Sequence, residues 1–217
     1  MSRPVRGFVT GMILLGLVAV MALLVPAEPL AIDRRWSEAM HDIQRVFLTD
    51  LALVFNALGR GVGQALSIAA VAIALTLSRR WLALVAFGLA EGLTSLSSTL
   101  LKAWIGRPRP PDGLVHPVSS GFPSGHAAYG GATCVALVLL FSRPGLRRRR
   151  WWTLAALGIA TMAWSRTYLQ VHWLSDVVAG SLLGVGMSLA VFGGIQVWNA
   201  LSVKGDRRRE AGSDLSR

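Results

Sequence analysis

Two polar residues, four positions apart, begin an apolar stretch near the end of the chain. His172 and Asp176 would lie on one face of a helix. A carboxylate beside an imidazole fixes its tautomer, so that one ring N–H points to Asp176 and the other ring nitrogen keeps its lone pair. Such a histidine can act as a nucleophile or a base. A His–Asp pair that only satisfies itself at a helix end would have the same spacing.

A second candidate site is the run Pro123-Ser124-Gly125-His126, which opens an earlier apolar stretch. Serine is a preferred N-cap residue, and glycine lets a ligand approach the backbone closely. The N–H groups at the start of a helix bind phosphate readily, and His126 lies within one turn of them. The run therefore indicates an anion site with a histidine beside it, or an ordinary helix cap.

Three cations stand close to these segments in the sequence: Lys102, Arg109 and Arg166. Arginine binds phosphate oxygens through two parallel hydrogen bonds, and lysine acts as a point charge. The three cations would suit a phosphate-bearing substrate. The alternative is that they reach toward lipid headgroups at a membrane surface, a role for which Arg107 is the better candidate.

The composition places these residues in a membrane protein. Of the 217 residues, 53% are hydrophobic and 15% are charged, and the mean hydropathy is +0.52. Soluble domains are about 25% charged, and a disordered or fibrous chain is excluded as well. Cys134 is the single cysteine, which excludes an intrachain disulfide and argues against a cysteine metal site.

Transmembrane helices must therefore position the candidate residues. A membrane span needs about 20 mostly apolar residues, and six stretches reach or nearly reach that length. We expect an all-α fold, with a six-span helical bundle as one domain over residues 1–202 and a basic, disordered cytoplasmic tail over residues 203–217. The expected spans are residues 8–25, 62–78, 81–101, 125–141, 151–168 and 174–196.

The basic residues orient this bundle. With the N-terminus inside, every inside segment carries at least two basic residues, and nearly all of the net charge of +11 falls there. This positive-inside pattern places both termini in the cytoplasm and the candidate residues at the outer face of the cell (inner) membrane. Topology and contact with anionic inner-leaflet lipids account for the charge, so nucleic-acid binding is not expected.

The first outside loop, residues 26–61, has apolar residues at three- and four-residue spacing. This pattern predicts an amphipathic helix, which would lie on the membrane surface or pack in the bundle. The first span also resembles a signal peptide that ends near Val25-Pro26-Ala27. Its apolar core is longer than the usual length of about 7–15 residues, and we therefore expect it to be retained.

Two features within the spans need a reason. Glu91 lies in the middle of the third span, where a charge is costly, so it either pairs inside the bundle or has a functional role. Gly180 and Gly184 predict close helix packing. That packing would be within the chain or between the subunits of a homodimer.

Together, the three polar segments resemble a family signature. The chain reads Lys102-x6-Arg109-Pro110, then Pro123-Ser124-Gly125-His126, then Ser165-Arg166-x5-His172-x3-Asp176. This is similar to the three-part signature of the type 2 phosphatidic acid phosphatase superfamily, which also contains the vanadium haloperoxidases. All three parts occur in the family's order and spacing, and they cover residues 102–176.

The resemblance implies a mechanism. His172 would attack phosphorus to form a phosphohistidine, Asp176 would orient it, and His126 would protonate the leaving group and then activate water. His172 must be neutral and His126 protonated, which implies a single pH optimum. The resemblance implies no metal and no other cofactor. The residues that would bind the phosphoryl oxygens are Lys102, Arg109, Ser124, Gly125 and Arg166.

The implied substrate is a membrane lipid phosphate. We expect a polyprenyl diphosphate, such as undecaprenyl diphosphate cleaved to the monophosphate. The alternatives are phosphatidic acid, phosphatidylglycerol phosphate, or transfer of the phosphoryl group to another acceptor. All present a phosphate above an apolar tail, so the motif cannot choose between them. The haloperoxidase relatives are soluble, so the expected spans argue against that activity. A non-enzymatic transporter or scaffold is the remaining alternative, and it predicts that His172→Ala has no effect in a hydrolysis assay.

Overall fold

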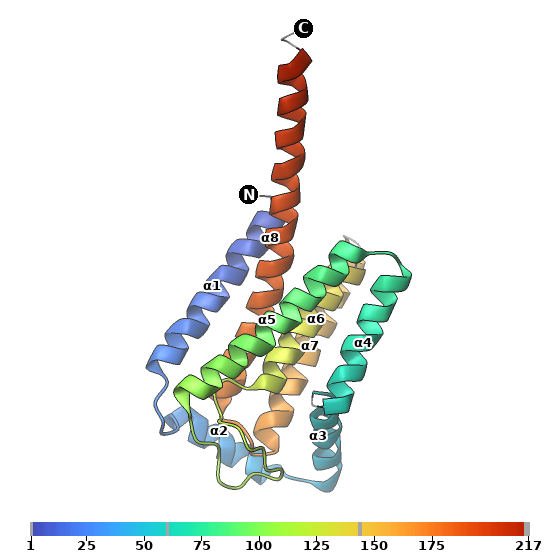
Figure 1. Ribbon diagram of the computed structural model, residues 1–217. Coiled ribbons are helices and arrows are strands. Elements are labelled where there is room, and N and C mark those ends of the chain that lie inside the picture. Colours follow the sequence, from blue (N-terminus) through green and yellow to red (C-terminus); the bar gives the residue numbers. More distant parts are fainter. Residues whose placement is uncertain (1, 60, 143–144, 215–217) are drawn as a thin grey trace.

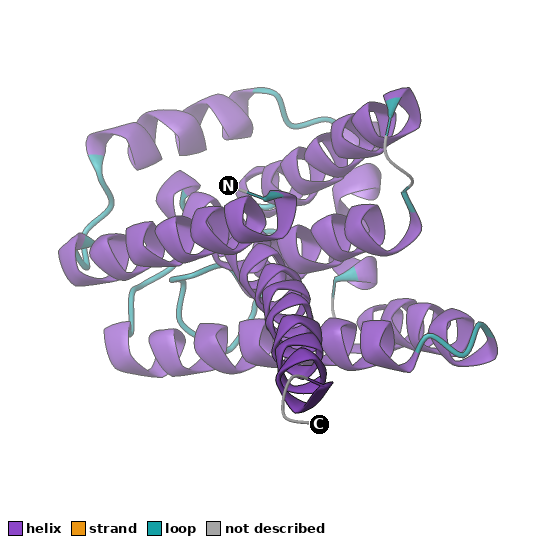
Figure 2. Cartoon of the chain, turned by 90° about the horizontal axis from the view of Figure 1, so that it is seen from above, coloured by secondary structure: helices purple, strands orange, loops and turns teal. Residues whose placement is uncertain are grey.

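The computed structural model describes residues 2–59, 61–142 and 145–214, with side chains up to Ser202. In these parts the chain consists of helices and loops, as Figures 1 and 2 show. The eight helices follow in order: α1 (Arg3–Leu24), α2 (Ala31–Asp42), α3 (Val46–Leu58), α4 (Gly61–Leu77), α5 (Trp81–Ile105), α6 (Gly125–Phe141), α7 (Leu146–Tyr168) and α8 (Leu174–Asp214).

Fewer helices than expected meet the length and hydropathy of a membrane span. Among the described residues, α1, α5 and the segment Leu174–Ser202 of α8 do so, and α3 with α4 would make a fourth span, bent by 60°. Helix α6 is apolar but has only 17 residues, and α7 starts with a run of arginines that lowers its mean hydropathy. The chain is a multi-pass membrane protein, and the expected count of six spans is not confirmed.

The long helices run alongside one another. Figure 1 shows α1 and α4 to α8 arranged lengthwise, with α2, α3 and the loop between α5 and α6 gathered at one end. At the opposite end α8 projects beyond its neighbours and continues as a helix to Asp214 (Figure 1). Side chains from residue 203 onward lie outside the described part, and the disordered tail stays a prediction.

The first loop contains two helices, α2 and α3, where the spacing predicted one. The chain breaks between them because Arg45 is extended, with φ −146° and ψ 147°. The backbone N–H of Arg45 donates to the hydroxyl of Tyr168 at 2.8 Å. Met40 of α2 and Ala52 of α3 are buried in one cluster with Tyr168. Both helices therefore pack against the bundle, which was one of the two alternatives.

Small residues let α6 and α8 touch along their backbones. A Cβ atom added at Gly180 would overlap the carbonyl oxygen of Ser124, and one added at Gly184 would overlap that of Ala128. The close packing predicted for the two glycines is thus within the chain, and a homodimer stays a prediction. The same contact joins the starts of the two helices, where the Ser124 N–H donates to the Asp176 carbonyl at 2.9 Å.

Candidate active site

A cavity of about 260 Å³ lies where the end of α5 meets the start of α6 and the end of α7. The three signature segments, which are far apart in the sequence, converge on it. Ser124 and Asp176 are fully buried and do not line it. The other six residues predicted for the site all line the cavity: Lys102, Arg109, Gly125, His126, Arg166 and His172.

His172 is held on both sides of its ring. Its Nε2 lies 3.0 Å from Nη1 of Arg109, and because a guanidinium can only donate, Nε2 carries the lone pair. The ring proton is then on Nδ1, which lies 3.5 Å from Oδ2 of Asp176, beyond an ordinary hydrogen bond. His172 thus has the tautomer that the sequence predicts for a nucleophile.

The surroundings also keep His172 uncharged. Burial lowers the pKa of His172 below the ordinary imidazole value of 6.5, the positive charges of Arg109 and Lys102 lower it further, and Asp176 opposes these effects. The side chain is only 3% exposed. Because burial dominates, the imidazole is neutral at physiological pH, as a nucleophile must be.

Asp176 is fixed by groups on both carboxylate oxygens. Oδ1 accepts a hydrogen bond from Nη1 of Arg107 at 2.5 Å, and Oδ2 accepts one from the backbone N–H of Trp173 at 3.0 Å. The side chain has no solvent exposure. Its position beside His172 is therefore set by the protein rather than by water.

Main-chain carbonyls of the α5–α6 loop hold two of the cations. Lys102 Nζ donates to the carbonyl of Ser120 at 2.8 Å. Arg109 Nε donates to the carbonyl of Ser119 at 2.7 Å, while its Nη1 reaches His172. Main-chain carbonyl groups therefore orient both cations toward the cavity.

Arg166 is almost fully buried, with 1% exposure. Its Nη1 donates to Oδ1 of Asn56 at 2.8 Å, and its Nε donates to Oγ of Ser165 at 3.2 Å. No carboxylate among the described residues forms an ion pair with it. A buried cation of this kind is suited to a phosphoryl group, because an anion in the cavity would offset its charge.

His126 lies on the α3 side of the cavity. Its Nε2 is 3.3 Å from the carbonyl oxygen of Asn56. A Cβ atom at Gly59 would lie only 2.5 Å from Cδ2 of His126, so the glycine leaves the space that the imidazole fills. Asn56 and Gly59 both line the cavity, and the sequence pattern did not identify either of them.

Ser124 and Gly125 have different surroundings at the start of α6. Ser124 is the N-cap of α6, as predicted, and its Oγ accepts from the Ala127 N–H at 3.5 Å. A Cβ atom at Gly125 would have its nearest neighbour, Oγ of Ser98, at 3.7 Å. The protein therefore leaves room for a side chain at this position, and the open space belongs to the cavity.

Arg107 was assigned to the membrane surface by sequence reasoning, and this assignment is wrong. Its side chain is fully buried and bridges two carboxylates, with Nη2 2.8 Å from Oδ2 of Asp33 and Nη1 2.5 Å from Oδ1 of Asp176. Asp33 is equally buried and lies on α2, far away in the sequence. The only sequence signal was an acid on a predicted amphipathic helix, which gives no partner.

Glu91 has a partner inside the bundle. Its Oε1 accepts a hydrogen bond from Oγ1 of Thr133 at 2.7 Å, which links α5 to α6. It does not line the cavity, so the contact favours the structural alternative. Among the described residues, no group of three or more His, Cys, Asp or Glu side chains could hold a metal ion; the metal-free mechanism stays a prediction.

Comparison with known proteins identifies the family to which this chain belongs. The PAP2 superfamily profile matches residues 80–199, which is more than half of the chain. The protein belongs to this superfamily, as the signature predicted.

The chain is also similar in sequence to two proteins whose names refer to different lipid substrates. The chain is 36% identical over 109 residues to phosphatidylglycerophosphatase B of Bacillus subtilis, a match that covers 47% of this chain and 53% of that one. It is 37% identical over 73 residues to undecaprenyl-diphosphatase of Sulfolobus acidocaldarius, covering 33% and 32%. The chain thus spans about half of the first relative and about a third of the second.

Two solved structures share the fold. One is the transmembrane PAP2-type phosphatidylglycerolphosphate phosphatase from Bacillus subtilis, with a TM-score of 0.70 and 26% identity over 90% of this chain and 97% of that one. The other is Aquifex aeolicus LpxE, with a TM-score of 0.61 and 21% identity over 75% and 95%. The second likeness concerns the fold alone.

Proposed function

We propose that this protein removes the phosphate monoester of phosphatidylglycerol phosphate and releases inorganic phosphate. The observation that carries the proposal is the cavity where the lone pair of His172 meets His126 and three cations. The choice of lipid is supported by the sequence match and the structural match, both of which are to a phosphatidylglycerophosphate phosphatase of Bacillus subtilis. The proposed lipid differs from the expectation from the sequence, which ranked undecaprenyl diphosphate as the first candidate substrate.

In the first step, Nε2 of His172 attacks phosphorus, and the bond from phosphorus to the lipid oxygen breaks. His126 gives a proton to that oxygen. Arg109 must turn its Nη1–H from Nε2 to a phosphoryl oxygen, because one lone pair cannot serve both. Asp176, beside Nδ1, stabilises the positive charge that develops on the ring. The product is a phosphohistidine at His172.

In the second step, water attacks phosphorus while His126 accepts its proton, and the N–P bond breaks to release phosphate. Lys102 and Arg166, which protein groups already hold in place, lower the energy of both transition states without reorienting. Arg109 joins them once its Nη1–H has turned from His172 to a phosphoryl oxygen. They supply the charge neutralisation that Mg²⁺ provides in many phosphoryl-transfer enzymes. The proposed phosphate-binding residues are Lys102, Arg109 and Arg166 through their side chains, with Ser124 and Gly125 at the start of α6.

We also propose that α1 and α4 to α8 all cross the membrane. This is supported by their lengthwise arrangement in Figure 1 and by the basic residues at the starts of α5 and α7, such as Arg80 before α5 and Arg148 in the first turn of α7. The positive-inside pattern then places those residues and both termini in the cytoplasm. The active-site cavity, at the other end of α5 and α7, faces the extracytoplasmic side of the cell (inner) membrane.

Phosphate release by the detergent-purified protein tests the function. The substrates are phosphatidylglycerol phosphate, undecaprenyl diphosphate and phosphatidic acid at equal surface concentration, with a chelator present and His172→Ala as the control. We expect chelator-resistant release, fastest from phosphatidylglycerol phosphate and lost in the variant. Equal release by the variant would contradict the assigned nucleophile, and silence of the folded wild type on every substrate would indicate transfer to another acceptor.

Undecaprenyl diphosphate remains the second candidate substrate. It is favoured by the likeness to the Sulfolobus acidocaldarius undecaprenyl-diphosphatase. The same two steps apply, with the lipid monophosphate as leaving group. Faster release from this substrate in the same panel would establish it in place of phosphatidylglycerol phosphate.

A further inference from the structure

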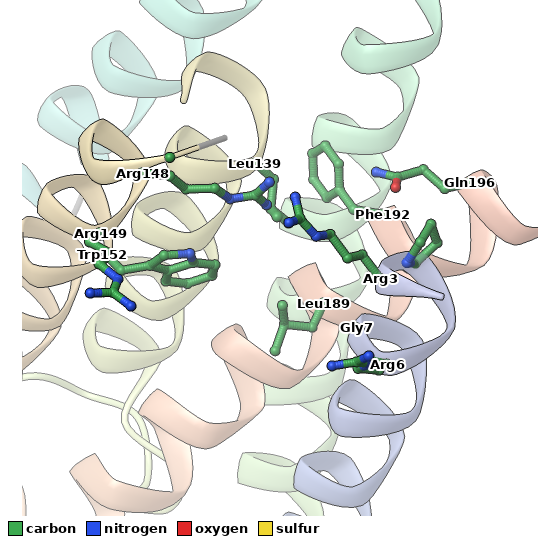
Figure 3. A pocket seen from close by; sticks show the side chains of 13 residues that line it. Arg3, Arg6, Gly7, Leu139, Arg148, Arg149, Trp152, Leu189, Phe192 and Gln196 are labelled. Carbon is green, nitrogen blue, oxygen red and sulfur yellow. The ribbon is translucent and has the colours of Figure 1, made fainter. Parts of the chain in front are cut away.

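A second cavity, of about 540 Å³, lies at the other end of the bundle. Figure 3 shows that arginines enter it from opposite walls, with Arg3 and Arg6 on α1 and Arg148 and Arg149 on α7. We call this cavity the arginine pocket. It shares no lining residue with the cavity around His172, so the catalytic site does not explain it.

The charge of the arginine pocket is concentrated and exposed. Arg3, Arg6 and Arg149 are exposed and Arg148 is half-buried. In residues 2–59, 61–142 and 145–202, no carboxylate forms an ion pair with Arg3, Arg148 or Arg149. Like charges around one cavity repel each other, and a bound anion would remove that repulsion.

The floor of the arginine pocket is apolar. Leu139 of α6 and both Leu189 and Phe192 of α8 line it, and Trp152 of α7 forms part of the wall (Figure 3). Tryptophan is enriched where a membrane protein meets the headgroup region. A cationic rim above an apolar floor matches an amphiphile, whose phosphate meets the arginines while its glycerol and first chain carbons cover the floor.

We propose that the arginine pocket binds the phosphate headgroup of an anionic phospholipid, in the leaflet opposite the active site. Basic pockets between transmembrane helices at the cytoplasmic side suit such headgroups. The bound lipid would join the start of α1 to the start of α7 across α8. This site is independent of the reaction at His172 and takes a different molecule from the substrate.

The run Arg147 to Arg150 offers a matched control for this proposal, because only Arg148 and Arg149 line the pocket. The variants are Arg148→Gln/Arg149→Gln and Arg147→Gln/Arg150→Gln, which remove the same charge from the same run. Full-length protein in detergent is titrated with short-chain phosphatidylglycerol, phosphatidylcholine of the same chain length, or inorganic phosphate. Bound lipid is counted by native mass spectrometry.

We expect phosphatidylglycerol to bind the wild type and the Arg147/Arg150 variant alike, and to bind the Arg148/Arg149 variant at least about tenfold more weakly, the loss of one or two charge-assisted hydrogen bonds. An equal loss of phosphatidylglycerol binding in both variants would show that the lipid binds a general basic surface, and this would overturn the proposed binding site. Equal binding of phosphatidylcholine would overturn the role of charge. Displacement of the lipid by equimolar inorganic phosphate would make free phosphate the ligand.

A different observation carries a second inference, which rests on the proposed function. Asp33, Arg107 and Asp176 form a chain of two ion pairs in which no side chain is exposed. Asp33 also binds the start of α8: its Oδ1 accepts from the Ser175 N–H at 2.8 Å, and its Oδ2 accepts from the Ser175 hydroxyl at 2.9 Å. The loop helix α2 thus holds the turn of α8 that carries Asp176.

We infer that Asp33 and Arg107 are positioning residues for the reaction. Neither lines the substrate cavity, so each can reach the reacting atoms only through Asp176. The two guanidinium nitrogens hold the two carboxylates at a fixed separation, which the planar arginine allows and a lysine does not. Asp176 is thereby held where it can stabilise the charge that grows on His172.

The variants Asp33→Asn and Arg107→Lys test this inference, with Asp42→Asn on the exposed side of α2 as the control. Per folded molecule, we expect kcat and the rate of phosphoenzyme formation to fall by about 10- to 100-fold, the scale of misplaced catalytic groups, with KM within twofold. Asp33→Glu should recover part of the loss. The control should match the wild type.

Two outcomes would overturn this inference. An unchanged kcat per folded molecule, with only the folded yield reduced, would show that the buried pairs act on stability alone. A change in KM with kcat constant would place the residues in substrate binding. An inactive wild type would instead contradict the proposed function, so the two failures are distinguishable.

Discussion

Arginines surround a cavity at each end of this bundle, but they are held differently. At the active site, Arg166 is buried against Asn56 and Ser165, and Arg109 is hydrogen-bonded to the carbonyl of Ser119 and to His172. In the arginine pocket, Arg3 and Arg149 are exposed. Protein groups hold the first set before a ligand arrives, and of its contacts only the one from Arg109 to His172 has to change. The second set must be ordered by its ligand.

The difference follows from what each end has to do. A transition state is stabilised most by charges that do not move as it forms, and buried partners provide this fixity at His172. A lipid headgroup needs charge and an apolar surface rather than exact geometry, so exposed arginines suffice. Conservative substitutions should therefore be severe at one end and mild at the other.

Replacing the nucleophile should have the largest effect. His172→Ala removes the only lone pair that Arg109 and Asp176 orient between them, so hydrolysis should fall by at least about 10⁴-fold, as for nucleophiles of other covalent enzymes. The measurement is phosphate release by the folded variant. Residual activity within tenfold of the wild type would contradict the assignment.

An Arg→Lys pair compares the two ends directly. Arg166→Lys loses the planar guanidinium that donates to Asn56 and Ser165 at once, and kcat/KM should fall by about 10²- to 10³-fold, the scale of one lost transition-state donor. Arg149→Lys keeps its charge in an exposed position, and kcat/KM should stay within twofold. Similar losses in both variants would remove the distinction between fixed and adaptable cations.

A smaller effect is expected from crowding the general acid. Gly59→Ala places a methyl group 2.5 Å from the present position of His126 Cδ2, so the imidazole must move and kcat should fall by about 10- to 100-fold. Gly88→Ala is the matched control, since nothing lies within 4 Å of its added Cβ. Full activity of Gly59→Ala would mean that the position of His126 does not limit the rate.

The smallest expected effect is a shift in the pH dependence of kcat/KM, compared with the profile that an ordinary, solvated histidine would give. Because burial lowers the pKa of His172 below 6.5, its neutral form persists as the pH falls through that value, and protonation removes the nucleophile only at lower pH. In a pH series of kcat/KM, the acid limb should therefore lie below about pH 6.5, the ordinary imidazole value. An acid limb at or above 6.5 would show that His172 is solvated like a surface histidine.

The sequence pointed to most residues of the candidate site because they lie in short segments, and six of the eight predicted residues line one cavity. The cap at Ser124 is a local feature and is confirmed. His172 and Asp176 lie close together, as their spacing predicts, but His172 lies in the turn before α8, which begins at Leu174, and not on the same helix. The remaining contacts come from residues that meet only in the folded chain. Asp33 and Arg107 are 74 residues apart in the sequence, and no local sequence pattern predicts such a pair.

The fold was predicted only in part. Apolar spacing identified helices in residues 26–61 but missed the break at Arg45, which depends on a hydrogen bond to the distant Tyr168. Apolar windows likewise suggested six spans, whereas the arginines at the start of α7 and the 17 residues of α6 leave those helices below the usual length and hydropathy. The first difference depends on a tertiary contact, and the second on the length and composition of single helices.

The most direct test of the central claim is to trap the phosphoenzyme. Phosphatidylglycerol phosphate with a radiolabelled phosphate monoester is mixed with wild type, His126→Ala and His172→Ala, quenched in alkali, and the labelled peptide is identified. Covalent catalysis by His172 predicts an acid-labile label on the peptide that contains His172, increased in His126→Ala and missing from His172→Ala. A label on another residue, or hydrolysis by His126→Ala and wild type without any label, would contradict the account.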